Sequence, residues 1–211
     1  MTQVHNSQTG RKLDLRRKLL GHISEPRVLE LYAGPGFMRA DVYAGLPVVG
    51  IDQDPHSVAE YLGDTAFICR CIDLSRFNVF DADAFAMPWE ALWVIAQRRE
   101  PLAGERVVVF GTDGGMGGGA NMKTTFAGKG WSGQMCRAIG VQPDDSPKGI
   151  ATGKDAQARC AHRLLAAFFE RWTVTRYLSS TGGGTGQTLY FGVLLTAGSP
   201  GAGPEVARAT R

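Results

Sequence analysis

The stretch Arg27-Val-Leu-Glu-Leu-Tyr-Ala-Gly-Pro-Gly36 is a short apolar run that stops abruptly at two closely spaced glycines. A run of this kind is typical of a buried strand that leads into a tight turn. Gly34 and Gly36 permit backbone conformations, and a close approach to the chain, that a Cβ would block. The helical spacing of residues 37–45 predicts a helix whose free N–H groups face a ligand at the turn.

A second apolar run, Val48-Val-Gly-Ile-Asp52, ends in a carboxylate about 22 positions after Glu30. An acidic side chain at the end of the second strand of a βαβ unit can accept hydrogen bonds from both hydroxyls of a ribose. The glycine turn and this acid together predict a nucleotide-like ligand.

These two segments look like motifs I and II of the class I S-adenosylmethionine-dependent methyltransferases. In that family the glycine turn lies against the methionine part of the cofactor, the second-strand acid holds the ribose, and an acid after the third strand often contacts the adenine amino group. The match to dinucleotide dehydrogenases is poorer, because residues 34–39 lack the third glycine that lets a helix pack close to a pyrophosphate. The resemblance implies S-adenosyl-L-methionine bound by Glu30, Tyr32, Ala33, Gly34, Gly36, Asp52, Gln53, Asp73 and Asp81, with Asp73 at the adenine.

The length and composition are typical of a single globular domain. A chain of 211 residues with 44% apolar and 20% charged residues fits one globular α/β domain, and no window approaches the length of an apolar membrane span. The N-terminus has no apolar signal segment, and the cysteines and histidines lack metal-ligand or redox spacing. We therefore expect a cytoplasmic protein without a metal.

The order of predicted elements is that of a Rossmann-like class I methyltransferase. We expect a mostly parallel, seven-stranded sheet with a terminal antiparallel hairpin and helices on both faces. The predicted organisation is an N-terminal basic extension and helix (1–26), a methyltransferase domain (27–197) with a substrate-facing insertion (112–154), and a disordered tail (198–211). The predicted strands are 27–32, 48–52, 66–70, 77–81, 106–110, 172–178 and 189–195, and the predicted helices are 11–21, 37–45, one beginning at Asp54, 88–99 and 155–171.

Two carboxylates and an aromatic, Asp81, Asp83 and Phe85, follow the strand at 77–81. An exocyclic amine on a base is a weak nucleophile, and a carboxylate that accepts its hydrogen bond makes it more reactive and can take its proton. An aromatic ring can stack on the base. The alternative is structural: Asp81 ends a strand, Asp83 caps the helix at 88–99, and Phe85 belongs to the core.

The segment Asp81-Ala-Asp-Ala-Phe-Ala-Met-Pro88 resembles the Asp-x-Asp-Pro-Phe/Tyr-Gly-x-Pro segment of the tRNA guanine-N2 dimethyltransferases. The resemblance implies that Asp83 contacts the target amine and that Phe85 stacks beside it. Ala84 and Ala86 replace the proline and glycine of that family.

The predicted function is methyl transfer to an amine nitrogen of a nucleic acid base, in RNA more than in DNA. The alternative is a non-catalytic nucleic-acid-binding module with the same fold. That alternative rests on the altered segment and on a basic cluster near the start of the chain, Arg11, Lys12, Arg16, Arg17 and Lys18.

Overall fold

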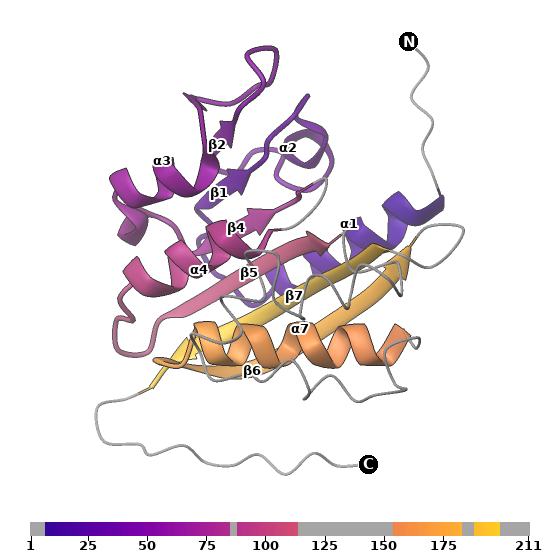
Figure 1. Cartoon of the computed structure of the whole chain (residues 1–211), viewed down its shortest axis with the longest axis vertical. Coiled ribbons are helices and arrows are strands. Elements are labelled where there is room, and N and C mark those ends of the chain that lie inside the picture. The colour runs from indigo at the N-terminus through magenta and orange to yellow at the C-terminus, as the bar shows by residue number, and fades with distance from the viewer. Residues whose placement is uncertain (1–6, 85–87, 114–153, 183–187, 199–211) are drawn as a thin grey trace, which may run out of the picture.

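A computed structural model describes residues 7–84, 88–113, 154–182 and 188–198. Helices and strands alternate along most of this chain (Figure 1). In chain order they are α1 (Ser7–Leu20), β1 (Val28–Leu31), α2 (Phe37–Asp41), β2 (Val48–Asp52), β3 (Tyr61–Leu62), α3 (Thr65–Cys71), the 3-10 helix η1 (Leu74–Arg76), β4 (Val79–Ala82), α4 (Trp89–Arg98), β5 (Arg106–Asp113), α7 (Lys154–Phe168), β6 (Trp172–Gly182) and β7 (Thr188–Ala197).

The seven strands of the described chain form one sheet in the order β3-β2-β1-β4-β5-β7-β6. Strands β1 to β5 are parallel, and β7 lies antiparallel between β5 and β6. The register sets Glu30 of β1 beside Gly50 of β2 and Asp81 of β4. This sheet confirms the predicted fold class, and it gathers the carboxyl ends of β1, β2 and β4 at one edge, where open α/β sheets bind their ligands.

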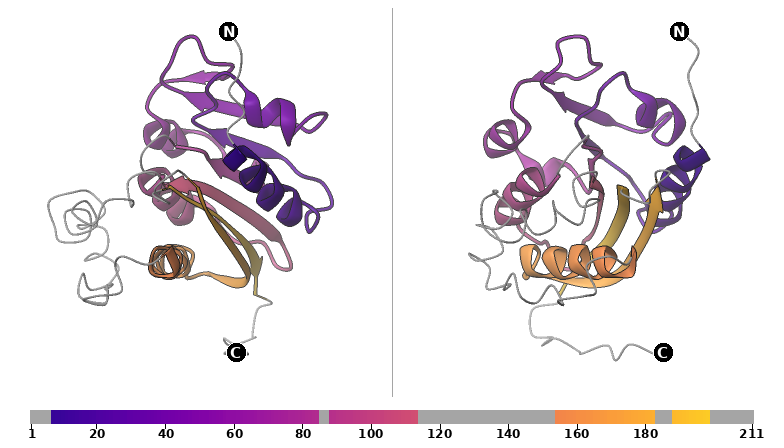
Figure 2. Two further views of the ribbon diagram at one scale, coloured as in Figure 1. Left: turned by 90° about the vertical axis from the view of Figure 1, so that its right-hand side faces the viewer. Right: turned by 45° about the vertical axis from the view of Figure 1, so that its right-hand side comes forward.

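Helices cover both faces of the sheet because successive strand residues point to opposite sides. Val28 and Phe110 pack with the apolar residues of α1 and α2, whereas Leu29 and Val109 pack with those of α3, α4 and α7. Figure 2 shows α1 across the sheet from α3 and α4. By the same alternation, Glu30 lies on the α1 side of the sheet.

Helix α1 packs on the second half of the sheet. Val28 of β1 belongs to the apolar cluster of this helix, but α1 lies mainly over β5, β6 and β7. Its buried leucines press on β7, where a Cβ added at Gly192 would come within 2.6 Å of Leu19 and 2.8 Å of Leu15. Residues 7–20 of the predicted N-terminal extension and helix thus form a helix that packs on the sheet.

The predicted helix at Asp54 and the predicted strand at 66–70 are both wrong. The carboxylate of Asp54 accepts a hydrogen bond from the amide of His56 at 2.8 Å and so closes a local turn instead of capping a helix. The run at 66–70 forms α3, because Asp64 caps it by accepting from the amide of Phe67 at 2.7 Å. The short strand β3 precedes it and pairs with the end of β2.

Most of the remaining elements follow the prediction closely, but the helix predicted at 37–45 ends at Asp41. Helix α4 begins one residue after Pro88, and β6 and β7 form the predicted hairpin, each longer than expected. In the part of the chain that the structure describes, no helix is long and apolar enough to cross a membrane. Most of the predicted insertion at 112–154 and of the tail at 198–211 lies outside the described residues.

Candidate active site

The turn after β1 holds three residues with positive φ angles. These angles are 64° at Tyr32, 52° at Gly34 and 84° at Gly36. This left-handed region favours glycine, since a Cβ there meets its own backbone. A Cβ at Gly36 would also come within 2.8 Å of the Val58 side chain. The second glycine is therefore required by packing as well as by the turn.

Asp52 closes this turn from the neighbouring strand. One of its carboxylate oxygens, Oδ2, accepts from the amide of Gly34 at 2.7 Å, and the other, Oδ1, accepts from the amide of Asp54 at 2.8 Å. The glycine turn and the second-strand acid thus face one pocket of about 570 Å³, a volume suited to a cofactor-sized molecule. The pocket is lined by Glu30, Tyr32, Ala33, Gly34, Pro35, Phe37, Met38, Asp52, Gln53, Asp54, Asp83 and Ala84.

The carboxylate of Glu30 is buried in this pocket and only partly satisfied. Its Oε2 has no hydrogen-bond partner among the described residues, and Arg39 Nε lies 3.7 Å away, too far for a hydrogen bond. Arg39 is held by Glu60, because its two terminal nitrogens donate to both Glu60 oxygens at 2.9 and 3.0 Å. Burial, and then the charge of Asp81, raises the pKa of Glu30 to about 7. Glu30 therefore supplies a buried carboxylate oxygen that has no hydrogen bond within the described residues.

Asp81 is fully buried and does not line the pocket. Arg16 of α1 donates to both of its oxygens, from Nε at 2.7 Å and from Nη2 at 2.6 Å, and the hydroxyl of Tyr43 donates as well. Burial by itself would lower the pKa of Arg16, but the charge and hydrogen bonds of Asp81 raise it above its ordinary value. This bidentate pair is a buried anchor between α1 and β4.

Asp83 lies at the pocket, and its side chain is 17% exposed. Its Oδ1 accepts from the hydroxyl of Thr112 at 2.7 Å, and its Oδ2 forms an ion pair with Lys12. Burial alone would raise the pKa of Asp83, but the charges of Arg16 and Lys12, with the hydrogen bonds from Lys12 and Thr112, hold it below its ordinary value. Asp83 is thus an ionised carboxylate at the mouth of the pocket.

The structure brings most, but not all, of the predicted site residues together. Gly36 is buried behind the turn and does not line the pocket. Asp73 is exposed, and its carboxylate caps η1 by accepting from the amide and hydroxyl of Ser75 at 3.0 and 2.7 Å. It follows a helix rather than the predicted third strand, which removes the positional reason for placing it at an adenine. Phe85 lies outside the described residues.

Sequence reasoning missed the role of α1 in the site. It treated Lys12 and Arg16 as members of a basic cluster, whereas both point toward the sheet and bind Asp83 and Asp81. A signal was available: residues 12, 15, 16 and 19 share one helical face, so Arg16 falls in the same stripe as Leu15 and Leu19. An arginine in an apolar stripe is buried only with a partner.

Asp113 is another buried acid, on the opposite face of β5 from Thr112. It ends β5 and accepts from the indole Nε1 of Trp89 at 2.8 Å, so it belongs to the core under α4. Within the described chain, no three His, Cys, Asp or Glu side chains are grouped so as to hold a metal ion.

Comparisons with known proteins identify the fold. Neither the protein-family models nor the curated proteins give a match to this sequence. Among solved structures, Trm1 of Pyrococcus horikoshii in complex with S-adenosyl-L-methionine aligns with a TM-score of 0.57 and 15% identity, over 92% of this chain and 57% of that one. The N-methyltransferase NodS of Bradyrhizobium japonicum WM9, in complex with S-adenosyl-L-homocysteine, aligns with a TM-score of 0.52 and 12% identity, over 92% and 89% of the two chains.

The chain therefore has the Rossmann-like fold of S-adenosylmethionine-dependent methyltransferases. The same fold is found in a putative hemolysin from Streptococcus thermophilus, with a TM-score of 0.51 and 13% identity over 94% of this chain and 70% of that one. Because proteins with such different descriptions share the architecture, the likeness shows the fold alone, and the function has to be argued from the site.

Proposed function

We propose that the protein is an S-adenosyl-L-methionine-dependent methyltransferase that acts on an amine nitrogen of a nucleic acid base. The observation that carries this proposal is the single pocket lined by the Gly34 turn, Asp52, Glu30 and Asp83. The Gly34 turn, Asp52 and Glu30 belong to the segments that resemble the cofactor motifs of the class I methyltransferases. Asp83 belongs to the segment that resembles the tRNA guanine-N2 dimethyltransferases, where the corresponding carboxylate contacts the target amine.

The residues of the pocket fit the cofactor. Asp52 lines the pocket, and each of its oxygens accepts from one backbone amide, which leaves a second lone pair on each oxygen for a ribose hydroxyl. The Oε2 of Glu30, which lies 3.7 Å from Arg39 Nε and has no hydrogen bond within the described residues, is an acceptor for the ammonium group of the methionine part. The bound cofactor supplies an electrophilic methyl group on a sulfonium, and the protein must hold a nucleophile about 3 Å from that carbon.

Asp83 is the residue that we assign to the acceptor amine. Its ionised Oδ2 already binds the ammonium of Lys12, so this oxygen has the charge and access needed to accept from an N–H donor. Thr112 fixes the orientation of the carboxylate through Oδ1. An incoming amine takes the place of Lys12 on Oδ2, gains electron density from the hydrogen bond and gives up its proton to Asp83.

RNA is the preferred substrate in this proposal, because the segment around Asp83 resembles that of enzymes acting on tRNA guanine. Phe85 keeps its predicted role as the stacking neighbour of the target base. We place the protein in the cytoplasm, since Cys69 and Cys71 are free thiols.

The test is to incubate the protein with methyl-labelled cofactor and separate RNA, DNA, protein and small-molecule fractions of a cell extract. We expect label in RNA. Asp83→Asn should lower labelling by about 100-fold or more, the range seen for loss of a general base, while binding of S-adenosylhomocysteine measured by calorimetry persists. If Asp83→Asn labels its substrate as well as the wild type does, Asp83 is not the catalytic base. If the protein binds no S-adenosylhomocysteine, the proposed reaction is wrong.

A second candidate function is nucleic-acid binding without catalysis. The observation that favours it is the closed pair between Lys12 and Asp83, in which the carboxylate is already satisfied. Oligonucleotide binding that is strongly salt-sensitive and indifferent to the cofactor, with no methyl transfer, is the result that selects this alternative.

A further inference from the structure

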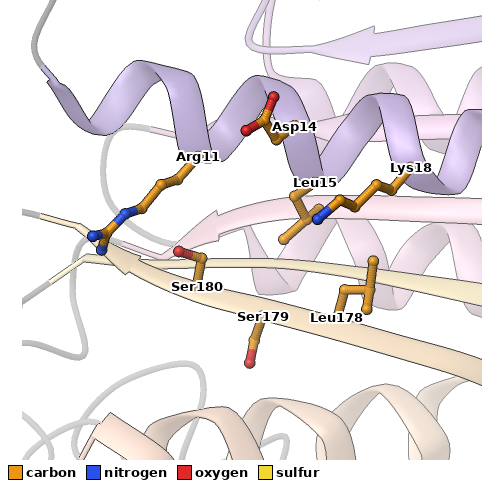
Figure 3. A pocket seen from close by; sticks show the side chains of 7 residues that line it. All are labelled: Arg11, Asp14, Leu15, Lys18, Leu178, Ser179 and Ser180. Atoms are coloured by element: carbon orange, nitrogen blue, oxygen red, sulfur yellow. The ribbon is translucent and has the colours of Figure 1, made fainter.

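A groove of about 350 Å³ runs between α1 and β6, outside the cofactor pocket. Figure 3 shows it from close by, with Arg11 and Lys18 reaching from the helix, and Leu178 and Ser180 pointing up from the strand. We call it the α1–β6 groove. Its floor is apolar at Leu15 and Leu178, and its two ends carry cationic side chains.

The two cations of the groove are available to a ligand. Arg11 and Lys18 are exposed, and within the described chain neither forms an ion pair with a carboxylate. Arg11 makes one long hydrogen bond to the carbonyl of Thr181 at 3.3 Å, which directs it along the strand. The acid of the groove, Asp14, has Arg17 as its neighbour at 3.9 Å. Seven residues of helix separate the two cations by about 10 Å, enough to contact different phosphates.

Neighbouring residues link the groove to the candidate active site through Tyr190. The sheet register sets Tyr190 of β7 between Ser180 of β6 and Thr112 of β5. The ammonium of Lys12 lies over the Tyr190 ring, 5.9 Å from its centroid. Thr112 and Lys12 are the two partners of Asp83. One row of side chains therefore leads from the groove, across an aromatic ring, to the carboxylate that we assign to the acceptor amine.

We propose that a single-stranded segment of the nucleic acid substrate lies in the α1–β6 groove, with its phosphates on Arg11 and Lys18 and a base stacked on Tyr190. This inference rests on the proposed function, and it assigns the path along which the substrate enters. A basic groove combined with an aromatic platform is how proteins bind single strands, and a target base must leave any duplex before its amine can enter a pocket.

The test uses the full chain and a labelled single-stranded 12-mer RNA, followed by fluorescence anisotropy at several salt concentrations. The variant Arg11→Gln/Lys18→Gln should bind more weakly, and the slope of log affinity against log salt should fall by about 0.7 for each lost phosphate contact. The matched control is Arg27→Gln/Arg76→Gln, which removes the same charge from exposed arginines at the amino ends of β1 and β4. It should keep both affinity and slope.

The stacking role of the Tyr190 ring is tested separately. Tyr190→Ala should weaken binding by about 5- to 150-fold, the range of one lost base stack, whereas Tyr190→Phe keeps the ring and should retain binding. Equal losses in the groove variant and the arginine control, or equal binding of the 12-mer and its duplex, would overturn the inference.

Calorimetry with S-adenosylhomocysteine separates this inference from the proposed function. A chain that binds the cofactor product but no oligonucleotide refutes the groove and leaves a methyltransferase for another substrate. A chain that binds neither refutes both. Oligonucleotide binding that depends on Arg11, Lys18 and the Tyr190 ring, together with cofactor binding, supports the groove as the substrate path.

Discussion

The two halves of the candidate site are built in different ways. The cofactor half, consisting of the turn at 32–36 and Asp52, is held by backbone amides and glycine conformations. The acceptor half consists of Asp83, with the buried anchor Asp81 two residues before it, and both are held by side chains from α1, more than sixty positions earlier in the chain. The first half depends on local geometry, whereas the second depends on burial and on charge pairing across the sheet.

This difference predicts which substitutions should disrupt each half. A backbone cradle tolerates changes in its surroundings as long as the turn itself forms. A buried ion pair fails when one partner is removed, because the other charge is left without water or a counter-ion. The predictions below separate the two cases, starting from the largest effect.

Of the single changes considered, Arg16→Met should lower the free energy of unfolding most. It leaves the carboxylate of Asp81 buried without its bidentate partner, at a cost of about 3–5 kcal/mol in the free energy of unfolding. Urea unfolding measures this loss. Arg17→Met, one residue along on the exposed side of α1, should stay within about 0.5 kcal/mol of the wild type. Similar losses in both variants would mean that the Arg16–Asp81 pair is not an anchor.

Glu30 should make the free energy of unfolding depend on pH. Its pKa of about 7 in the folded protein lies above the ordinary 4.5, so the folded state binds the proton more tightly. Stability that is fully present below pH 4.5 is lost as the pH rises to about 7, by on the order of 3 kcal/mol at most. Affinity for the cofactor should rise over the same pH range, because the ammonium group of its methionine part binds the ionised form of Glu30. Glu30→Gln, as the reference, should show neither slope; parallel curves for the two proteins would contradict the assignment.

Asp52→Ala should weaken binding of S-adenosylhomocysteine by roughly 10- to 100-fold, since it removes a charged hydrogen-bond acceptor from the pocket. Isothermal titration calorimetry measures the change. Asp73→Ala is the informative partner, because the sequence assigns Asp73 to the adenine and the structure shows it capping η1. We expect the affinity of this variant to be unchanged, and a comparable loss would restore the prediction from sequence.

Two glycines with nearly equal backbone angles test packing at the turn. Gly36 has φ 84° and Gly45 has φ 80°, so alanine at either position meets the same left-handed strain of about 1 kcal/mol. Only Gly36 also has a side chain, Val58, within 2.8 Å of an added Cβ. Thermal unfolding of the alanine variants should place Gly36→Ala about 1 kcal/mol below Gly45→Ala, and a smaller gap would mean that Val58 moves aside.

The sequence predicted the fold well where a pattern has one structural meaning. The apolar runs at β1, β2 and β5 are each bounded by proline or glycine, those at β2 and β5 are rich in valine, and the final pair of runs separated by glycines is typical of a hairpin. The run at 66–70 is different, because a short apolar segment fits a strand or a helix equally well. Asp64 decides the case by capping α3, and its position before the run was a helix signal that the prediction did not use.

For this protein, the sequence alone predicted most of the strands, the final hairpin and the joining of the Gly34 turn with Asp52, because these depend on patterns and residues close together in the chain. Only the tertiary structure decided the environment of the acceptor carboxylates. Lys12 and Arg16 meet Asp83 and Asp81 because α1 packs across the sheet, and nothing in a local pattern names the partner of a buried charge. The same packing formed the groove beside β6, where the other basic residues of α1 remain open to a ligand.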